Sequence, residues 1–309
     1  MNRHYEVIIV GGGPAGLTAG LYTTRARINT LLIEGRLLGG QIVNTERIEN
    51  YPGFPNGISG FELGQLMHQQ ATNYGLETIF TEVTALKLND AKNILTTNEG
   101  DFTADALIIA GGSEHQKLGV PGEDKLTGKG VSSCATCDGP LFKDEVVAVI
   151  GGGDAAITEA LALTKFASSV KVIHRRDQLR ASKIIQERAF AQPKLEFLWH
   201  TVVTEILGDT AVKQLKLEQL KTGDRYTLDV TGVFVAIGFI PNTRYLKETL
   251  ALDETGQIIT NHLMQTNIAS IFAAGDIRHN SPRQVITAAG DGATAALSAE
   301  EFLTQLRRK

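Results

Sequence analysis

Short apolar runs alternate along this chain with longer segments of helical periodicity, and most of the runs end at glycine or a charged residue. Two examples are "YEVIIV" at 5–10 and "DALIIAGG" at 105–112. Runs of this length predict buried strands, and the amphipathic segments between them predict helices. The alternation therefore predicts an α/β protein built on parallel sheets. None of the runs reaches the about 18 apolar residues that a membrane-spanning helix needs, so we expect no membrane segment.

The apolar pattern repeats itself once within the chain. Residues 5–35 and 144–176 share one order: a strand, a glycine turn, an amphipathic segment, a second strand, and a polar residue at the end of that strand. This order is typical of a dinucleotide-binding βαβ unit. The sequence thus predicts two such units in tandem.

Glycine and proline interrupt the apolar pattern at 111–128 and at 238–243, which marks these stretches as candidate crossings between domains. If both are crossings, the second unit is inserted into the first domain. We then expect two Rossmann-like, three-layer α/β domains, one formed by 1–113 with 246–309 and the other by 114–245.

The first glycine turn has the G-x-G-x-x-G pattern at Gly11, Gly13 and Gly16, directly after the strand "VIIV". Such glycines permit a tight turn, close approach of the backbone to a pyrophosphate, and close packing of helix on strand. Glu34 ends the second strand at about the 20-residue spacing expected for an acid that binds ribose hydroxyls. We assign this unit to FAD.

The second glycine turn has the variant pattern G-x-G-x-x-A at Gly151, Gly153 and Ala156. Its second strand ends in basic residues where the first unit has an acid: Arg175 and Arg176, with Arg180 further on. A carboxylate there would repel a 2′-phosphate, whereas guanidinium groups pair with it. This unit therefore predicts a site that prefers NADPH to NADH.

Two further stretches support a flavin in the first domain. Residues 105–113 predict a strand that runs into a turn of small residues, and residues 270–303 predict a strand ending at Gly275-Asp276, a polar loop and a long helix beginning near Arg283. The carboxylate of Asp276 is placed to hold a ribityl hydroxyl. The helix N-terminus would favour the negative charge that develops on a flavin ring when it is reduced.

Both cysteines of the chain, Cys134 and Cys137, lie in "SSCATCDGP" at 132–140. Four interpretations are open: a zinc site, a structural disulfide, two buried thiols, or a redox-active dithiol. Zinc needs about four ligands, and the chain has no second cysteine pair or closely spaced histidine pair. A disulfide closing so short a loop stabilises little. A dithiol needs a nearby proton donor, which Asp138 supplies, so the residues favour a redox-active pair.

Composition excludes several other classes of protein. The 309 residues suggest about two domains. The net charge is -4 and no long basic run occurs outside "HRRDQLR" at 174–180, so we expect no nucleic-acid partner. No signal-peptide pattern opens the chain. Two cysteines are too few for an extracellular disulfide framework, so we expect a cytoplasmic protein.

Together these motifs resemble the low-molecular-weight thioredoxin reductases over nearly the whole chain. The matching stretches are "GGGPAG" at 11–16, "GGQ" at 39–41, "ENYPG" at 49–53, "CATCDG" at 134–139, "GGGDAA" at 151–156, "HRRDQLRASKI" at 174–184 and "AAGDIR" with "RQVITAAGDG" at 273–292. The resemblance implies a homodimer that passes electrons from NADPH to FAD, to a Cys134–Cys137 disulfide and then to thioredoxin. It also implies that Cys137 lies nearer the flavin, that Cys134 attacks the substrate, and that Asp138 is the acid and base.

The resemblance implies cofactor contacts at positions that match the family's motifs, and no metal. For FAD these are Gly11, Gly13, Pro14, Ala15, Gly16, Glu34, Gly35, Gly39, Gly40, Gln41, Asn50, Val83, Ala110, Gly111, Gly275, Asp276, Ile277, Arg283, Gln284 and Val285. For NADPH they are Gly151, Gly153, Asp154, Ala155, Ala156, His174, Arg175, Arg176 and Arg180.

Three alternatives to an NADPH-dependent reductase stay open. Relatives often carry a hydroxyl where Ala155 stands and a glutamate where Thr158 stands, so an enzyme that takes electrons from ferredoxin is one. A flavin dithiol oxidase is the second, although it has no need of the basic residues at 175–180. The third is a redox-sensing protein that binds both nucleotides without turnover, for which Asp138 has no purpose.

Overall fold

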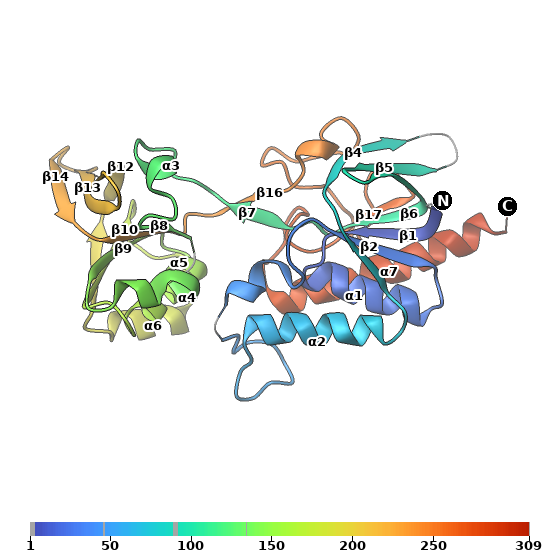
Figure 1. Ribbon diagram of the computed structural model, residues 1–309, viewed down its shortest axis with the longest axis horizontal. Helices are drawn as coiled ribbons and strands as arrows, with labels where there is room; N and C mark the ends of the chain where they lie inside the picture. Colours follow the sequence, from blue (N-terminus) through green and yellow to red (C-terminus); the bar gives the residue numbers. More distant parts are fainter. Residues whose placement is uncertain (1–3, 46, 89–91, 134, 309) are drawn as a thin grey trace. The chain divides into compact units, whose positions relative to one another are not determined.

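The computed structural model describes residues 4–45, 47–88, 92–133 and 135–308. The chain divides into two compact units, coloured along the sequence in Figure 1. The first unit contains Met1–Glu114 and Ile240–Lys309, and the second contains His115–Phe239. The second unit is thus an insertion in the chain of the first.

The first unit is built on a seven-stranded sheet of order β3-β2-β1-β6-β5-β4, in which β17 also pairs with β6. Its strands are β1 (His4–Val10), β2 (Thr30–Glu34), β3 (Glu77–Phe80), β4 (Val83–Leu88), β5 (Asn93–Thr97), β6 (Gly100–Ile109) and β17 (Ile271–Ala273). Its helices are α1 (Pro14–Arg25), α2 (Gly60–Thr72) and α7 (Val285–Leu306), with short 3-10 helices η1 (Gly40–Asn44) and η3 (Arg244–Leu246). Strands β1, β2, β3, β6 and β17 are parallel, as the sequence predicts.

Alternate residues of the central strands face two apolar layers. Val7 and Ile9 of β1 pack in a cluster with residues of α1 and α7, and α1, α2 and α7 cover that face of the sheet (Figure 1). Ile8 and Val10 face the other way, into a cluster that includes residues of β4, β5 and η3. Burial on both faces explains why the strands appear in the sequence as continuous apolar runs.

The second unit has a five-stranded parallel sheet of order β11-β10-β9-β15-β8 and a separate antiparallel sheet of order β12-β13-β14. Its strands are β8 (Val131–Ser132), β9 (Val146–Ile150), β10 (Ser169–His174), β11 (Leu195–Trp199), β12 (Thr201–Gly208), β13 (Val212–Gln219), β14 (Arg225–Asp229) and β15 (Gly232–Val235). Its helices are α3 (Glu123–Leu126), α4 (Ala135–Asp138), the 3-10 helix η2 (Gly139–Phe142), α5 (Asp154–Leu163) and α6 (Lys183–Phe190). Helices α4, α5 and α6 share one apolar cluster with the parallel sheet, and the antiparallel sheet packs in another (Figure 1).

Both units therefore have the α/β architecture that the sequence predicts. The two crossings, β7 (Ser113–His115) and β16 (Phe239–Pro241), pair with each other as a two-stranded sheet. The second crossing lies before the boundary expected at 245–246. Asn242 donates to Gly111 O at 2.9 Å and Thr243 Oγ1 donates to Gly256 O at 2.6 Å, and these bonds tie the residues after β16 to the first unit.

Across the described residues, no helix combines the length and the apolar character needed to cross a membrane. The longest helix, α7, instead packs against α1 through its small residues.

Candidate functional site

In the glycine turn between β1 and α1, two glycines have no room for a side chain and a third has open space beside it. A Cβ on Gly16 would lie 1.8 Å from Gly11 O, and a Cβ on Gly11, whose φ is 108°, would lie 2.4 Å from Ala110 O, so neither residue tolerates a side chain. A Cβ on Gly13 would meet only the Gly40 Cα, at 4.0 Å. Gly13 caps α1, and no side chain of the described residues caps the first backbone N–H groups of that helix. Open space beside uncapped N–H groups fits a pyrophosphate.

Glu34 is fixed beside this turn by backbone bonds. Its Oε2 accepts from Gly12 N at 2.6 Å, and its Oε1 accepts from Arg36 N at 2.7 Å. Each carboxylate oxygen can accept a second hydrogen bond. Glu34 can therefore bind the ribose hydroxyls for which the sequence predicts it.

The "GGQ" loop packs on the other side of the turn. Gly39 N donates to Gly12 O at 2.8 Å, and a Cβ on Gly40 would lie 3.1 Å from Gly13 Cα. Gln41 Nε2 donates to Ser113 O at 2.9 Å. This loop and the small-residue turn after β6 are thereby joined to the same site.

The loop between β17 and α7 closes the site from the carboxyl end of the sheet. Gly275 has a φ of 79°, and a Cβ there would lie 2.9 Å from the Ala15 Cβ. Asp276 follows it, half-buried, and accepts from Ser281 Oγ at 2.9 Å. Burial raises the pKa of the Asp276 carboxyl. A carboxylate poorly supplied with water gains from a hydroxyl donor, as a ribityl chain would offer.

Helix α7 begins at Val285, slightly later than the start near Arg283 that the sequence predicts. Gln284 is its N-cap and forms a capping box with Thr287, which accounts for the later start. Gln284 Oε1 also accepts from Asn50 Nδ2 at 2.9 Å. Two predicted FAD residues that lie far apart in sequence thus meet at one helix terminus.

The remaining predicted FAD residues border the same region. Val83 packs in a cluster with the ends of β1 and β2, and Ile277 lies against Gly111. The others lie next to residues already described: Pro14 opens α1, Gly35 follows Glu34, Ala110 donates to Val10 O at 2.7 Å, and Arg283 precedes the cap of α7. The structure thus gathers the predicted set at the carboxyl ends of the parallel strands.

The second glycine turn, between β9 and α5, repeats this construction. A Cβ on Gly151 would lie 2.3 Å from Ala236 O and 2.6 Å from the Ala156 Cβ, which explains the small residue at 156. Gly153 has nothing within 4 Å of its Cβ position. Ala155 is exposed on the first turn of α5. This turn also has room for a pyrophosphate at the start of the helix.

His174 lies beneath that turn. A Cβ on Gly152 would lie within 2.4 Å of the imidazole ring, and His174 Nε2 is 3.1 Å from Gln178 O. Burial lowers the pKa of His174, and the nearby charges of the three arginines at 175, 176 and 180 lower it further. The lowered pKa favours a neutral ring, which packs directly against the glycine turn.

The basic loop is bonded to the turn at both of its ends. Arg180 N donates to Gly152 O at 2.6 Å, and Ser182 N donates to Asp154 Oδ1 at 2.6 Å. Arg175, Arg176 and Arg180 are exposed, and within the described part of the chain none of them forms an ion pair. Three unpaired guanidinium groups on a loop that is bonded to the glycine turn are suited to a 2′-phosphate.

Cys134 lies outside the described residues, as does the side chain of Cys137. The backbone of Cys137 belongs to α4, which is only four residues long and runs into η2 at Gly139. So short a helix has little dipole with which to stabilise a thiolate. Asp138 ends α4 and is half-buried. Ala135 is buried in the cluster with α5, which anchors the cysteine segment to the second glycine-turn helix.

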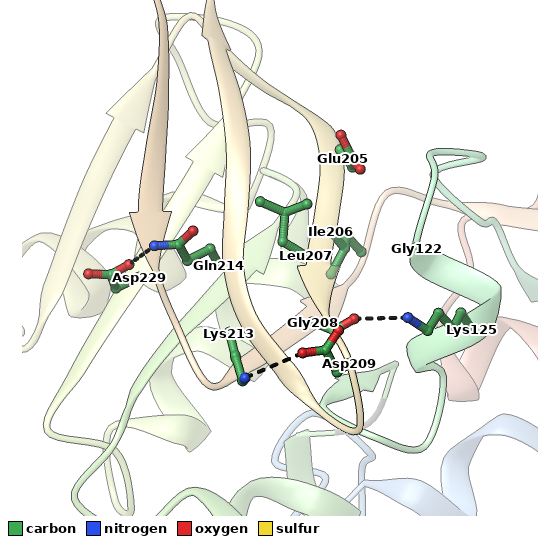
Figure 2. A pocket seen from close by; sticks show the side chains of 10 residues that line it. All are labelled: Gly122, Lys125, Glu205, Ile206, Leu207, Gly208, Asp209, Lys213, Gln214 and Asp229. Atoms are coloured by element: carbon green, nitrogen blue, oxygen red, sulfur yellow. Dashed lines mark hydrogen bonds and ion pairs between the residues drawn. The ribbon is translucent and has the colours of Figure 1, made fainter.

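A hollow of about 760 Å³ lies elsewhere in the second unit, between α3 and the antiparallel sheet (Figure 2). Its polar groups bond to one another: Lys213 to Asp209 at 3.6 Å, Lys125 Nζ to Gly208 O at 3.1 Å and Gln214 Nε2 to Asp229 at 2.6 Å. None of the predicted site residues lines it.

Sequence reasoning missed several polar residues that shape these sites. They are Arg278 and Asp291, Ser281 beside Asp276, Asn242 beside Gly111, and Glu159 of α5, whose Oε2 is buried without a hydrogen-bond partner. The acid in "AAGDGA" at 288–293 was the available signal for Asp291, since it interrupts a stripe of small helix residues. Within the described ranges, no group of three or more metal-binding side chains occurs.

Comparison with known proteins decides the family. Residues 5–292 match the pyridine nucleotide-disulphide oxidoreductase family. The thioredoxin reductase of Streptomyces coelicolor is 49% identical over 304 residues, which is 97% of this chain and 94% of that protein. The chain belongs to the thioredoxin reductase family.

Solved structures of thioredoxin reductases agree with this fold. The Lactococcus lactis enzyme, in its FR conformation, superposes with a TM-score of 0.95 at 43% identity and covers 97% of this chain and 99% of its own. The T. acidophilum enzyme gives a TM-score of 0.92 at 32% identity, covering 98% of this chain and 99% of its own. The resemblance to thioredoxin reductases found in the sequence is thereby confirmed.

Proposed function

We propose that this protein is an NADPH-dependent flavoprotein that reduces the disulfide of thioredoxin or of a thioredoxin-like protein. One observation carries the proposal. A single chain holds two open glycine turns, one bonded to the carboxylate of Glu34 and the other bonded to a loop that carries three exposed arginines, with a Cys-x-x-Cys segment anchored to the second. Membership of the thioredoxin reductase family supports it.

The first unit is proposed to hold FAD. Gly13 and the first turn of α1 would receive the pyrophosphate, Glu34 would accept from the adenosine ribose, and Asp276 would accept from the ribityl chain. When bound, FAD takes a hydride from NADPH and passes two electrons to a disulfide. The buried residues at Ala110, Ile277 and Ala274 exclude water from the carboxyl edge of the sheet.

The second unit is proposed to hold NADPH. Gly153 and the first turn of α5 would receive its pyrophosphate, and the arginines of the basic loop would pair with its 2′-phosphate. The bonds of Arg180 N and Ser182 N to the glycine turn keep the loop in register with that phosphate. Selectivity for NADPH over NADH follows from charge and not from shape.

The two cysteines are proposed to cycle between a disulfide and a dithiol. Two electrons and two protons convert the Cys134–Cys137 disulfide into two thiols. Asp138 would take the proton of the Cys134 thiol, the Cys134 thiolate would attack one sulfur of the substrate disulfide, and the sulfur that leaves would take that proton from Asp138. Asp138 would then take the proton of the Cys137 thiol, and the Cys137 thiolate would attack the Cys134 sulfur of the mixed disulfide. The second substrate sulfur would leave with that proton, which releases the reduced substrate and restores the Cys134–Cys137 bond.

An anaerobic titration of the purified protein tests this proposal. We expect four-electron reduction by NADPH, much weaker reduction by NADH, and reduction of a thiol-reactive dye only when NADPH and thioredoxin are both supplied. Cys134→Ser should lower the uptake to two electrons and abolish dye reduction, whereas the neighbouring Ser133→Ala should change neither. Dye reduction that persists in Cys134→Ser would refute the dithiol step.

The same titration separates the alternatives. Flavin reduction by ferredoxin but not by NADPH would identify ferredoxin as the electron donor. Peroxide formation from a dithiol without NADPH would indicate an oxidase. Tight nucleotide binding with negligible turnover would indicate a sensor.

We also propose that the protein is a cytoplasmic homodimer. The first unit exposes large apolar side chains on α2 and α7, including Phe61 and Leu297, which are 51% and 56% exposed. Surfaces of this kind are common at subunit interfaces. Light scattering after gel filtration would test the dimer, and a monomer at micromolar concentration would contradict it.

A further inference from the structure

The loop that joins β17 to α7 contains a buried ion pair with no role in the proposal above. Arg278 Nε donates to Asp291 Oδ2 at 2.6 Å, and Arg278 Nη2 donates to Asp291 Oδ1 at 2.9 Å. The two side chains are only 15% and 9% exposed. A bidentate pair of this kind fixes orientation as well as distance. The pair therefore locks the loop onto the second turn of α7.

The same pair holds the backbone on both sides of Asp276. Asp291 Oδ2 also accepts from Gly275 N at 3.1 Å, just before Asp276. Arg278 Nη1 donates to His279 O at 3.0 Å, three residues after Asp276. Asp276 thus lies in a turn whose two ends bond to one ion pair, and its own Oδ1 is oriented by Ser281.

Both parts of this arrangement rest on the first turn of α1. A Cβ on Gly275 would lie 2.9 Å from the Ala15 Cβ, and a Cβ on Gly292, next to Asp291, would lie 2.1 Å from Ala15 O. Ala15 follows the opening at Gly13 by two positions. The ion pair therefore ties the turn of Asp276 to the proposed pyrophosphate site.

Two carboxylates, Asp276 of this loop and Asp291 of α7, lie close together, so a nearby cation is needed to stabilise them. Burial raises the pKa of Asp276, and the charge of Asp291 raises it further, while Ser281, Arg283 and Arg278 act in the opposite direction. Without Arg278, Asp291 would be a buried carboxylate with no cation, next to a second carboxylate. Such a group moves or takes up a proton, and either change would release Gly275 N.

We propose that Arg278 and Asp291 are positioning residues whose ion pair orients Asp276 toward a ribityl hydroxyl of FAD. The proposal rests on the assignment of FAD to the first unit. The pair touches no cofactor itself. Its effect on flavin binding passes through Asp276.

A double-mutant cycle on flavin affinity tests this. Apoprotein of the wild type, Arg278→Met, Asp276→Asn and the double variant would be titrated with FAD, with flavin fluorescence as the signal. We expect each single substitution to raise the Kd about tenfold, which corresponds to the loss of one charge-assisted hydrogen bond. The double variant should be no more than about tenfold weaker as well, because both changes disable the same contact.

Two further variants keep the result interpretable. Arg307→Met removes an arginine that pairs with Glu6 at the far end of α7, so it controls for the loss of a charge and an ion pair away from Asp276, and its Kd should equal that of the wild type. Arg278→Lys keeps the charge without the bidentate geometry and should give an intermediate Kd. It also serves if Arg278→Met does not fold.

The outcomes separate the inference from the assignment of FAD. An unchanged Kd for Arg278→Met alongside a raised Kd for Asp276→Asn would overturn the inference and leave the FAD site intact. An effect near a hundredfold in the double variant would overturn it too, since independent effects multiply. A wild-type apoprotein that does not bind FAD would refute the assignment itself.

Discussion

The buried carboxyl of Glu159 provides a sharp test of the electrostatics of the second unit. Glu159 lies on α5, and its Oε2 is buried with no hydrogen-bond partner. Burial raises the pKa of Glu159 from 4.5 to about 8. Each tenfold difference in proton affinity is worth about 1.4 kcal/mol. Ionising this carboxylate in the folded chain should therefore cost about 5 kcal/mol more than ionising it in the unfolded chain.

The sign of the pH dependence follows from this difference. Because the folded chain keeps this proton more tightly, the contribution of Glu159 to the free energy of unfolding is highest below pH 4.5 and falls as the pH rises toward 8. Glu159→Gln has nearly the same shape but cannot ionise. We expect the variant to equal the wild type near pH 5 within about 1 kcal/mol and to be more stable at pH 8 by about 3 kcal/mol or more.

Urea unfolding at pH 5 and pH 8 would measure the effect. The only tryptophan, Trp199, lies in β11 of the same unit, so its fluorescence reports the unfolding of the unit that carries Glu159. Glu187→Gln, at an exposed position on α6, is the matched control and should show no such difference. A Glu159→Gln curve that stays parallel to the wild type from pH 5 to pH 8 would refute the reasoning.

Three other substitutions test the glycine turns and the basic loop. Arg176→Ala should raise the KM for NADPH about tenfold or more and leave that for NADH unchanged, as steady-state kinetics would show; an equal loss with both would contradict the 2′-phosphate assignment. Gly152→Ala places a Cβ within 2.4 Å of His174 and should destabilise the second unit by about 1–3 kcal/mol in urea unfolding. Gly292→Val, 2.1 Å from Ala15 O at its Cβ, should separate α7 from α1, so the purified protein should be colourless; a yellow variant would count against the site.

Much of the fold could be predicted because the chain alternates between two easily recognised patterns, continuous apolar runs and amphipathic segments of helical periodicity. The strands β1, β2, β6 and β9 are apolar on both faces, so they stand out as continuous runs, and the two glycine turns mark where each one meets a helix. The prediction of an α/β protein with two such units was correct for this reason. The positions of the glycines, Glu34 and the basic loop also follow from local sequence, because each lies within one βαβ unit.

The sequence could not predict contacts between distant segments. The pairing of Asn50 with Gln284, and of Arg278 with Asp291, depends on where a loop and a helix meet in space. The start of α7 was placed slightly early because Gln284 caps the helix through a side chain that the sequence does not mark as a cap. The second crossing lies within the expected stretch 238–243, but the domain bound at 245–246 lies beyond it, because the bonds of Asn242 and Thr243 to the first unit are formed only on folding.

The pairing of β7 with β16 has a consequence for how such a chain can be built and altered. Gln116 N donates to Gly238 O at 2.7 Å, so the inserted segment begins and ends at neighbouring residues. A segment whose two ends lie side by side can be treated as a separate module of the chain. The segment can be removed, and the first unit can then be closed by a short linker between 114 and 240. The segment can also be exchanged for another domain whose termini are adjacent, without stretching the sheet of the first unit. The nucleotide preference proposed for the second unit would therefore move with this segment to another host domain.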